Sequence, residues 1–144
     1  MVSSLSSVVA HALPRLSAIP EQAAELKPAP DKWSRKEILG HLIDSAANNH
    51  QRLVRLQLED EISLPGYDQD GWVRVSRHQN LPWMELVALW AAYNRHLAAI
   101  IESLDPSALD HVWHSPDGDV TLEFIATDYV RHLEHHLQQI GLSV

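Results

Sequence analysis

Apolar residues recur every three or four positions over four long stretches of the chain, and this spacing predicts four amphipathic helices. Prolines and glycines lie between the stretches, where they interrupt helices. Four long helices with short connections indicate an all-α four-helix bundle, and the whole chain, residues 1–144, is predicted to be one domain. The predicted helices run from about Ser3 to Ala18, from Arg35 to about Asp60, from Pro82 to about Leu104, and from Thr121 to Gly141.

Two of these helices carry recognisable start signals. Ser34 followed three residues later by Glu37 is a capping box, so the second helix is expected to begin near Arg35. Thr121 can cap the last helix, and Gly141 is a residue type that commonly ends one.

The connections differ in character. Pro65–Gly71, with the sequence PGYDQDG, is polar and rich in helix breakers, so we expect an irregular loop there. Asp105-Pro106 can cap one short turn. His111–Leu122 holds an Asp-Gly turn between short β-prone flanks, which predicts a small β-hairpin directly before the last helix.

Composition excludes several functional classes. The chain has no cysteine, so a metal must be held by nitrogen and oxygen ligands. A formal charge of -8, with 11 basic residues that form no stripe, disfavours nucleic acid as a partner. No apolar stretch approaches the roughly 18 residues of a membrane span, and the N-terminus lacks the layout of a signal peptide. We therefore expect a cytoplasmic protein without membrane contact.

The last helix contains three histidines in the run RHLEHHLQQI. On a helical wheel, His132, His136 and Asp128 fall on the apolar face, and burying them unpaired would cost about 1 to 3 kcal/mol each. The apolar face comprises Phe124, Ile125, Tyr129, Leu133, Leu137 and Ile140, whereas Glu123, Thr127, Glu134, Gln138 and Gln139 are expected on the opposite face.

Two interpretations of these inward-facing side chains remain open. Imidazoles four residues apart on a helix can bind one ion, and His132 with His136 is the preferred pair, with His135 as the other partner for His132. The H-x-x-x-H spacing alone carries little weight in a chain with 10 histidines. The alternative is a hydrogen-bonded core cluster of His132, His136 and Asp128 without metal.

A metal site needs a third ligand from another helix. The second helix has a polar stripe along the edge of its apolar face, which either lines a cavity or is an ordinary solvated surface. The stripe consists of His41, Ser45, Asn48 and Arg52. By residue type, the candidate third ligands are His11, His41, His50, His78, His96, His111 and His114.

Four segments resemble the DinB/YfiT-like superfamily, in particular its metal-dependent hydrolase branch. They are KWSRKEILGHLIDSAANNHQRL (Lys32–Leu53), PGYDQDGWV (Pro65–Val73), WHSPDGDVTLEF (Trp113–Phe124) and RHLEHHLQQI. The resemblance lies in their order: a capped helix with a histidine, an acidic-aromatic loop, a hairpin, and H-x-x-H-H in the last helix.

This resemblance implies a bundle that holds a divalent ion through three histidines, here His41, His132 and His136. Zinc or nickel is expected, and iron or manganese are the alternatives. It also implies a homodimer, which the apolar residues Trp83, Leu86 and Trp90 would help to form. The loop residues Tyr67, Asp68, Asp70 and Trp72 would form a lid or wall of the pocket, or else an ordinary solvated turn.

The expected function is a metal-dependent hydrolase that acts on a small molecule, because such an ion makes water nucleophilic and polarises carbonyls. The alternatives are a metal-dependent thiol S-transferase and a non-catalytic bundle that binds metal or a ligand. Asp44 and Asp128 are weak candidates for a catalytic or ligand-orienting role. Arg52 could bind an anionic substrate group or pair with Glu59. His114 is a candidate pocket residue.

Overall fold

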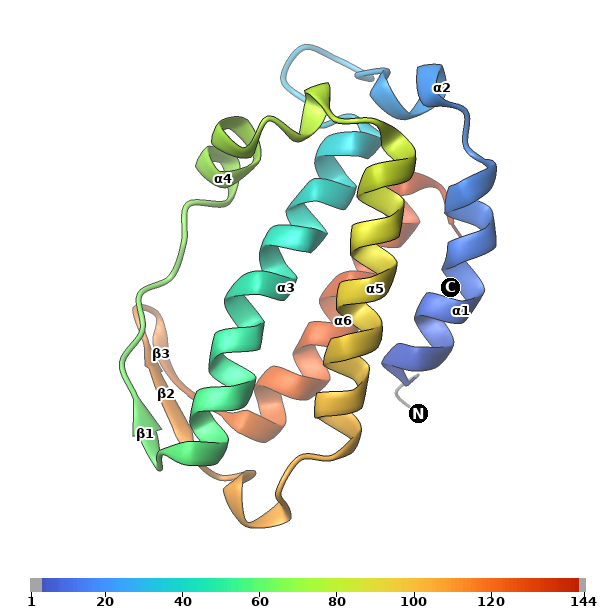
Figure 1. The fold of residues 1–144 in the computed structure, drawn as a ribbon. Helices are drawn as coiled ribbons and strands as arrows, with labels where there is room; N and C mark the ends of the chain where they lie inside the picture. The colour runs from blue at the N-terminus through green and yellow to red at the C-terminus, as the bar shows by residue number, and fades with distance from the viewer. Residues whose placement is uncertain (1–3, 143–144) are drawn as a thin grey trace.

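Four long helices pack side by side around one hydrophobic core in the computed structural model, which describes residues 4–142 (Figure 1). Helix α3 packs against α5 and α6, and α1 packs against the same two helices, so the predicted four-helix bundle is confirmed. Ser3, where we expected the first helix to begin, lies outside the described residues. The four helices are α1 (Leu5–Ala18), α3 (Arg35–Leu58), α5 (Trp83–Glu102) and α6 (Leu122–Ile140).

The helix ends follow the predicted capping chemistry. The Ser34 hydroxyl accepts from the Glu37 N–H at 3.2 Å, and the Glu37 carboxylate accepts from the Ser34 N–H at 3.1 Å. Thr121 caps α6 by accepting from the N–H of Phe124. Gly141 ends α6 with a φ of 109°, a left-handed conformation that glycine adopts without steric cost.

The expectation of an irregular loop over Pro65–Gly71 is wrong at its C-terminal end, because helix α4 (Gln69–Ser76) begins inside it. The Asp68 carboxylate accepts from the Gly71 N–H at 3.0 Å and caps this helix. A Cβ on Gly71 would overlap that carboxylate, so a larger residue there would require the Asp68 side chain to shift. The short helix α2 (Glu21–Glu25) was also not predicted.

A three-stranded sheet lies beside the C-terminal end of α3 and the start of α6 (Figure 1). Strands β2 (Val112–Ser115) and β3 (Gly118–Thr121) form the predicted hairpin. The predicted short turn is also present, as the 3-10 helix η2 (Pro106–Ala108). Strand β1 (Glu61–Ile62) pairs in parallel with β2 and was not predicted, because two residues are too few to show a periodic pattern.

The residues that we expected to support a dimer lie in the core of the single chain. Trp83, Leu86 and Trp90 are each at most 1% exposed, so this part of the prediction is wrong. Helix α1 packs on this side of α5, and the Trp83 indole N–H donates to the Leu16 carbonyl of α1 at 2.8 Å. Within residues 4–142, no helix combines the length and apolar character needed to cross a membrane.

Candidate metal centre

Three imidazoles from two helices converge between α3 and α6. His41 lies on α3, and His132 and His136 lie one turn apart on α6. The Nε2 atom of His132 is 3.4 Å from that of His41 and 3.1 Å from that of His136. One nitrogen from each of the three rings lies within 4.8 Å of the other two. The structure therefore brings together the three residues that the resemblance implies as ligands.

The spacing of these nitrogens is compatible with a set of metal ligands. Two imidazole nitrogens 2.0 to 2.1 Å from one ion in tetrahedral geometry are about 3.3 Å apart. The two measured separations, 3.4 and 3.1 Å, lie close to this value. Three imidazoles leave at least one tetrahedral position for water or substrate, the arrangement typical of catalytic sites.

Burial keeps these histidines neutral, as ligation requires. Burial, together with the smaller effects of the neighbouring His136 and His132 rings, lowers the pKa of His41 to about 3. Burial also lowers the pKa of His132 to about 4, and that of His136 below its usual value. The imidazole lone pairs are therefore available at neutral pH.

The contacts of His136 and His41 fit the same role. His136 Nδ1 lies 2.8 Å from the Gln139 Oε1, and since an amide oxygen only accepts, Nδ1 carries the proton and Nε2 keeps its lone pair. His41 is fully buried, and its Nδ1 has no hydrogen-bond partner among residues 4–142. The ring of Trp33 lies 5.0 Å from the His41 ring and covers it. These donors and their surroundings fit a divalent cation.

Asp44, a weak candidate for a role beside His41, is engaged elsewhere. Its two carboxylate oxygens lie 3.0 and 3.1 Å from His78 Nε2, and both side chains are buried. The His78 ring lies so close to Gly40 that a Cβ there would overlap it. Asp44 and His78 thus form a buried pair next to the turn of α3 that carries His41.

The helical wheel misplaced three residues of α6. Phe124 is 52% exposed and faces a surface cavity rather than the core. Gln139 contacts His136, three residues earlier, although we expected it on the opposite face. Asp128 has a half-exposed side chain 3.8 Å from Arg131, so it is not buried with the histidines. The core-facing arc is centred on the buried residues Leu133 and Leu137, which moves all three positions to its edge or beyond.

The remaining histidines have other contacts. His135 is exposed and lies outside the group of converging nitrogens, in agreement with the preference for His136. His50 contacts the Tyr93 hydroxyl, and His111 contacts the Leu56 carbonyl. His114 is an exposed residue of β2, where it contacts Asp119 and Glu61, and it does not line the cavity next to His132.

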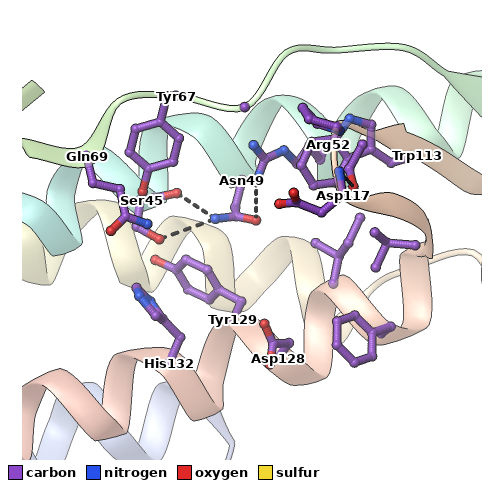
Figure 2. Close-up of a pocket in the computed structure, with 16 residues that line it drawn as sticks. Ser45, Asn49, Arg52, Tyr67, Gln69, Trp113, Asp117, Asp128, Tyr129 and His132 are labelled. Carbon is purple, nitrogen blue, oxygen red and sulfur yellow. Dashed lines mark hydrogen bonds between the residues drawn. The ribbon is translucent and has the colours of Figure 1, made fainter. Parts of the chain in front are cut away.

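A cavity of about 350 Å³ opens next to His132 and is bounded by α3, α6, the hairpin and the segment before α4 (Figure 2). Ser45 and Arg52 of the α3 stripe line this cavity and are buried. At these two positions the stripe therefore lines a cavity and is not an ordinary solvated surface. Of the four predicted loop residues, Tyr67 lines this cavity, and Trp72 packs edge-on against Tyr67 at 5.5 Å. Asp68 instead caps α4.

A second cavity, of about 570 Å³, is lined by His136. Trp33, Asp70 and Gln139 contribute to its wall. Two cavities therefore reach the histidine cluster, one at His132 and one at His136. No periodic pattern predicts this arrangement, since the segments that form the two walls are far apart in the chain.

Comparison with known proteins gives a consistent pattern. A protein of Oceanobacillus iheyensis named as a candidate metal-dependent hydrolase is 27% identical over 113 residues, which cover 78% of this chain and 65% of that protein. A second protein of that organism, named in the same way, is 25% identical and covers 75% of this chain and 63% of its own length. The chain thus spans less than two thirds of these curated relatives.

The fold matches a solved structure of YfiT from Bacillus subtilis, with a TM-score of 0.84 and 21% identity over 96% of this chain and 80% of that one. YfiT is described as a candidate metal-dependent hydrolase with an unusual four-helix bundle topology. A mycothiol-dependent maleylpyruvate isomerase matches with a TM-score of 0.78 and 14% identity, over 97% of this chain and 59% of that one. The sequence profile of the DinB superfamily matches residues 5–140. The chain is therefore a member of the DinB superfamily.

Proposed function

We propose that the chain is a metal-dependent hydrolase that acts on a small molecule, with a divalent ion held by the Nε2 atoms of His41, His132 and His136. The observation that carries this proposal is the convergence of three neutral imidazole nitrogens from α3 and α6. A bound ion would supply a Lewis acid that polarises a substrate carbonyl and makes water nucleophilic at neutral pH. Imidazole ligands suit zinc and nickel, which are the ions we expect, and iron and manganese are alternatives.

The cavity at His132 is where we place the substrate. Hydrolysis of an ester or amide gives the water hydroxyl to the acyl carbon and a proton to the leaving group. Asp128 lines the same cavity and is half exposed, so it is the carboxylate that we propose for proton transfer. Asp44 would not contact the substrate. It would support the site indirectly, by holding His78 against the backbone of α3 next to His41.

Metal binding by untagged protein tests the proposal. Calorimetric titration of the chelator-treated wild type with zinc and with nickel should give one equivalent bound. His132→Ala should weaken binding at least about 100-fold, because two imidazoles remain. His135→Ala is the matched control on the same helix and should bind like the wild type. Substoichiometric metal that His132→Ala leaves unchanged would contradict the proposal.

The zinc-loaded protein should then hydrolyse members of a panel of small esters and amides, and Asp128→Asn should lower kcat about 100-fold while leaving zinc stoichiometry unchanged. Full metal occupancy without turnover of any panel member would favour a non-catalytic metal-binding bundle.

A second candidate function is a metal-dependent thiol S-transferase. The observation that favours it is the pair of cavities that reach the histidine cluster, one lined by His132 and one by His136, since a transferase must bind a thiol and an acceptor together. In that reaction the thiol sulfur would form a bond to the acceptor carbon, the leaving group would depart with its electron pair, and the thiol proton would go to solvent. Incubation with a small thiol and an electrophilic acceptor distinguishes the two reactions. A transferase gives a thioether that requires both substrates, whereas a hydrolase gives the same products with and without thiol.

A further inference from the structure

The cavity beside His132 has two chemically different parts (Figure 2). One part is polar and is formed by α3, with Ser45, Asn49 and Arg52. The other part, formed by the hairpin and the first turns of α6, carries most of the apolar lining together with Asp117 and Asp128. Its apolar side chains are Trp113, Val120, Phe124 and Ile125. A ligand with a polar group and an apolar body would match both parts.

Arg52 is a buried cation without a counter-ion. Its side chain is 7% exposed, and across residues 4–142 no carboxylate comes within 4.0 Å of the guanidinium, so the pairing with Glu59 that the sequence allowed is absent. A buried charge without an opposite charge is costly, and burial accordingly lowers the pKa of Arg52. A bound anionic ligand that supplied the opposite charge would offset this cost.

The contacts of Arg52 fix its orientation and leave it able to bind. The guanidinium carbon stands 3.7 Å over the Trp113 ring, which holds one face of the group. One terminal nitrogen donates to the Asn49 Oδ1 at 3.2 Å. A guanidinium has five N–H donors in a planar fork that matches a carboxylate, so this arrangement leaves donors for a ligand.

Two carboxylates of the protein also line the cavity and limit the charge of the ligand. Asp117, at the hairpin turn, is exposed, and the side chain of Asp128 is half exposed and 3.8 Å from Arg131. Neither reaches Arg52 within the distance of an ion pair. Their negative charge disfavours a doubly charged phosphate more than a singly charged carboxylate.

We propose that Arg52, held by Trp113 and Asn49, binds a carboxylate of the substrate, so that the substrate class is a small carboxylic acid with an apolar body. This inference rests on the proposed function, because it treats the cavity at His132 as the substrate site. The carboxylate binds at the α3 side, the apolar body packs against Val120 and Ile125, and the reacting group lies toward His132. Arg52 is a positioning residue for the reaction and a binding residue for the acid.

The test compares 3-phenylpropanoate with its neutral amide, 3-phenylpropanamide, on the full chain. Titrations of the chelator-treated and zinc-loaded wild type, followed by the side-chain Nε–H resonances of arginine, report binding independently of activity. We expect the Arg52 resonance to shift with the acid and not with the amide, and the acid to bind at least about tenfold more tightly. Arg52→Gln should remove this preference, and Arg52→Lys, which keeps the charge but loses the planar fork, should restore part of it.

Each other outcome also decides the question. Equal affinity for acid and amide in the wild type, or a shift confined to Arg131, overturns the proposal even if Arg52→Gln does not fold. Tighter binding of inorganic phosphate than of the acid, with a shift of the Arg52 resonance, overturns the assignment of a carboxylate. Zinc uptake without preference for the acid overturns this inference and leaves the proposed metal site intact. Preference for the acid in a protein that takes up no zinc supports the Arg52 subsite and contradicts the metal-dependent function.

Discussion

Two buried histidines on either side of the first turns of α3 have opposite surroundings. His41 is 0% exposed and faces two other imidazoles, whereas His78 is 6% exposed and faces the carboxylate of Asp44. His78 Nε2 meets the Asp44 carboxylate within the protein, whereas His78 Nδ1 has no hydrogen-bond partner among residues 4–142. The nitrogens around His41 instead face other imidazole nitrogens 3.1 to 3.4 Å apart, an arrangement that a shared cation would satisfy. Burial alone therefore does not identify a site, but the identity of the partner does.

The largest effect that separates the two regions should come from Asp44→Ala. Removing this carboxylate leaves His78 buried without its partner and should lower the free energy of unfolding of the metal-free protein by about 3 to 5 kcal/mol. Urea unfolding measures the change. If the Asp44–His78 pair is not part of the metal site, the folded variant should bind as many equivalents of zinc as the wild type. Zinc binding is therefore measured at a temperature where the variant is folded. Loss of zinc binding in the folded variant would show that the pair belongs to the metal site.

Gly40→Ala should have the next largest effect. The added Cβ would overlap the His78 ring, and overpacking of this kind costs about 1 to 3 kcal/mol of stability. Gly66→Ala is the matched control, because a Cβ there would meet the Pro116 ring at an ordinary contact distance of 3.7 Å. Equal melting temperatures of the two variants would contradict the close approach of His78 to α3.

Gln139→Ala tests the histidine cluster itself, through the contact of Gln139 with His136. The Gln139 side chain orients His136 through its Nδ1, and loss of such a supporting contact should weaken zinc binding about tenfold while leaving the metal-free protein about as stable as before. Gln138→Ala, at a neighbouring exposed position of α6, should bind zinc like the wild type. Calorimetry on the three proteins gives the answer, and equal affinities would mean that His136 is oriented by packing alone.

The smallest effect is expected at His114. This histidine is exposed, and its pKa is shifted in the opposite direction to the pKa values of His41 and His132. Hydrogen bonds to Asp119 and Glu61 raise its pKa above the usual value of about 6.5. A raised pKa in the folded state means that the protonated form stabilises the fold fully below about pH 6.5, and that this contribution is lost as the pH rises through the folded pKa. The difference in unfolding free energy between wild type and His114→Gln should therefore be small at pH 5.5, absent at pH 9, and reduced by added salt. A difference that grows with pH would have the wrong sign.

Local rules were enough to predict the bundle and the capped ends of its helices. The periodicity of α6 also brought His132 and His136 to one face, because both lie on a single helix. His41 was identified as a ligand only through the resemblance, since no pattern within α3 determines which face of that helix points toward α6. The pairing of Asp44 with His78, and of Arg52 with Trp113, depends on how η1 (His78–Asn80) and the hairpin fold back onto α3. Such long-range contacts leave no periodic signal in the sequence.

The separation of the converging imidazoles along the chain has a consequence for folding. His41 and His132 are 91 positions apart, so an ion shared by them would bridge the first and last thirds of the polypeptide like a removable cross-link. Because the unfolded chain offers no such preformed site, the free ion concentration would set how much the native state gains. A chelator would then act as a mild denaturant of this protein, although it touches no residue of the hydrophobic core.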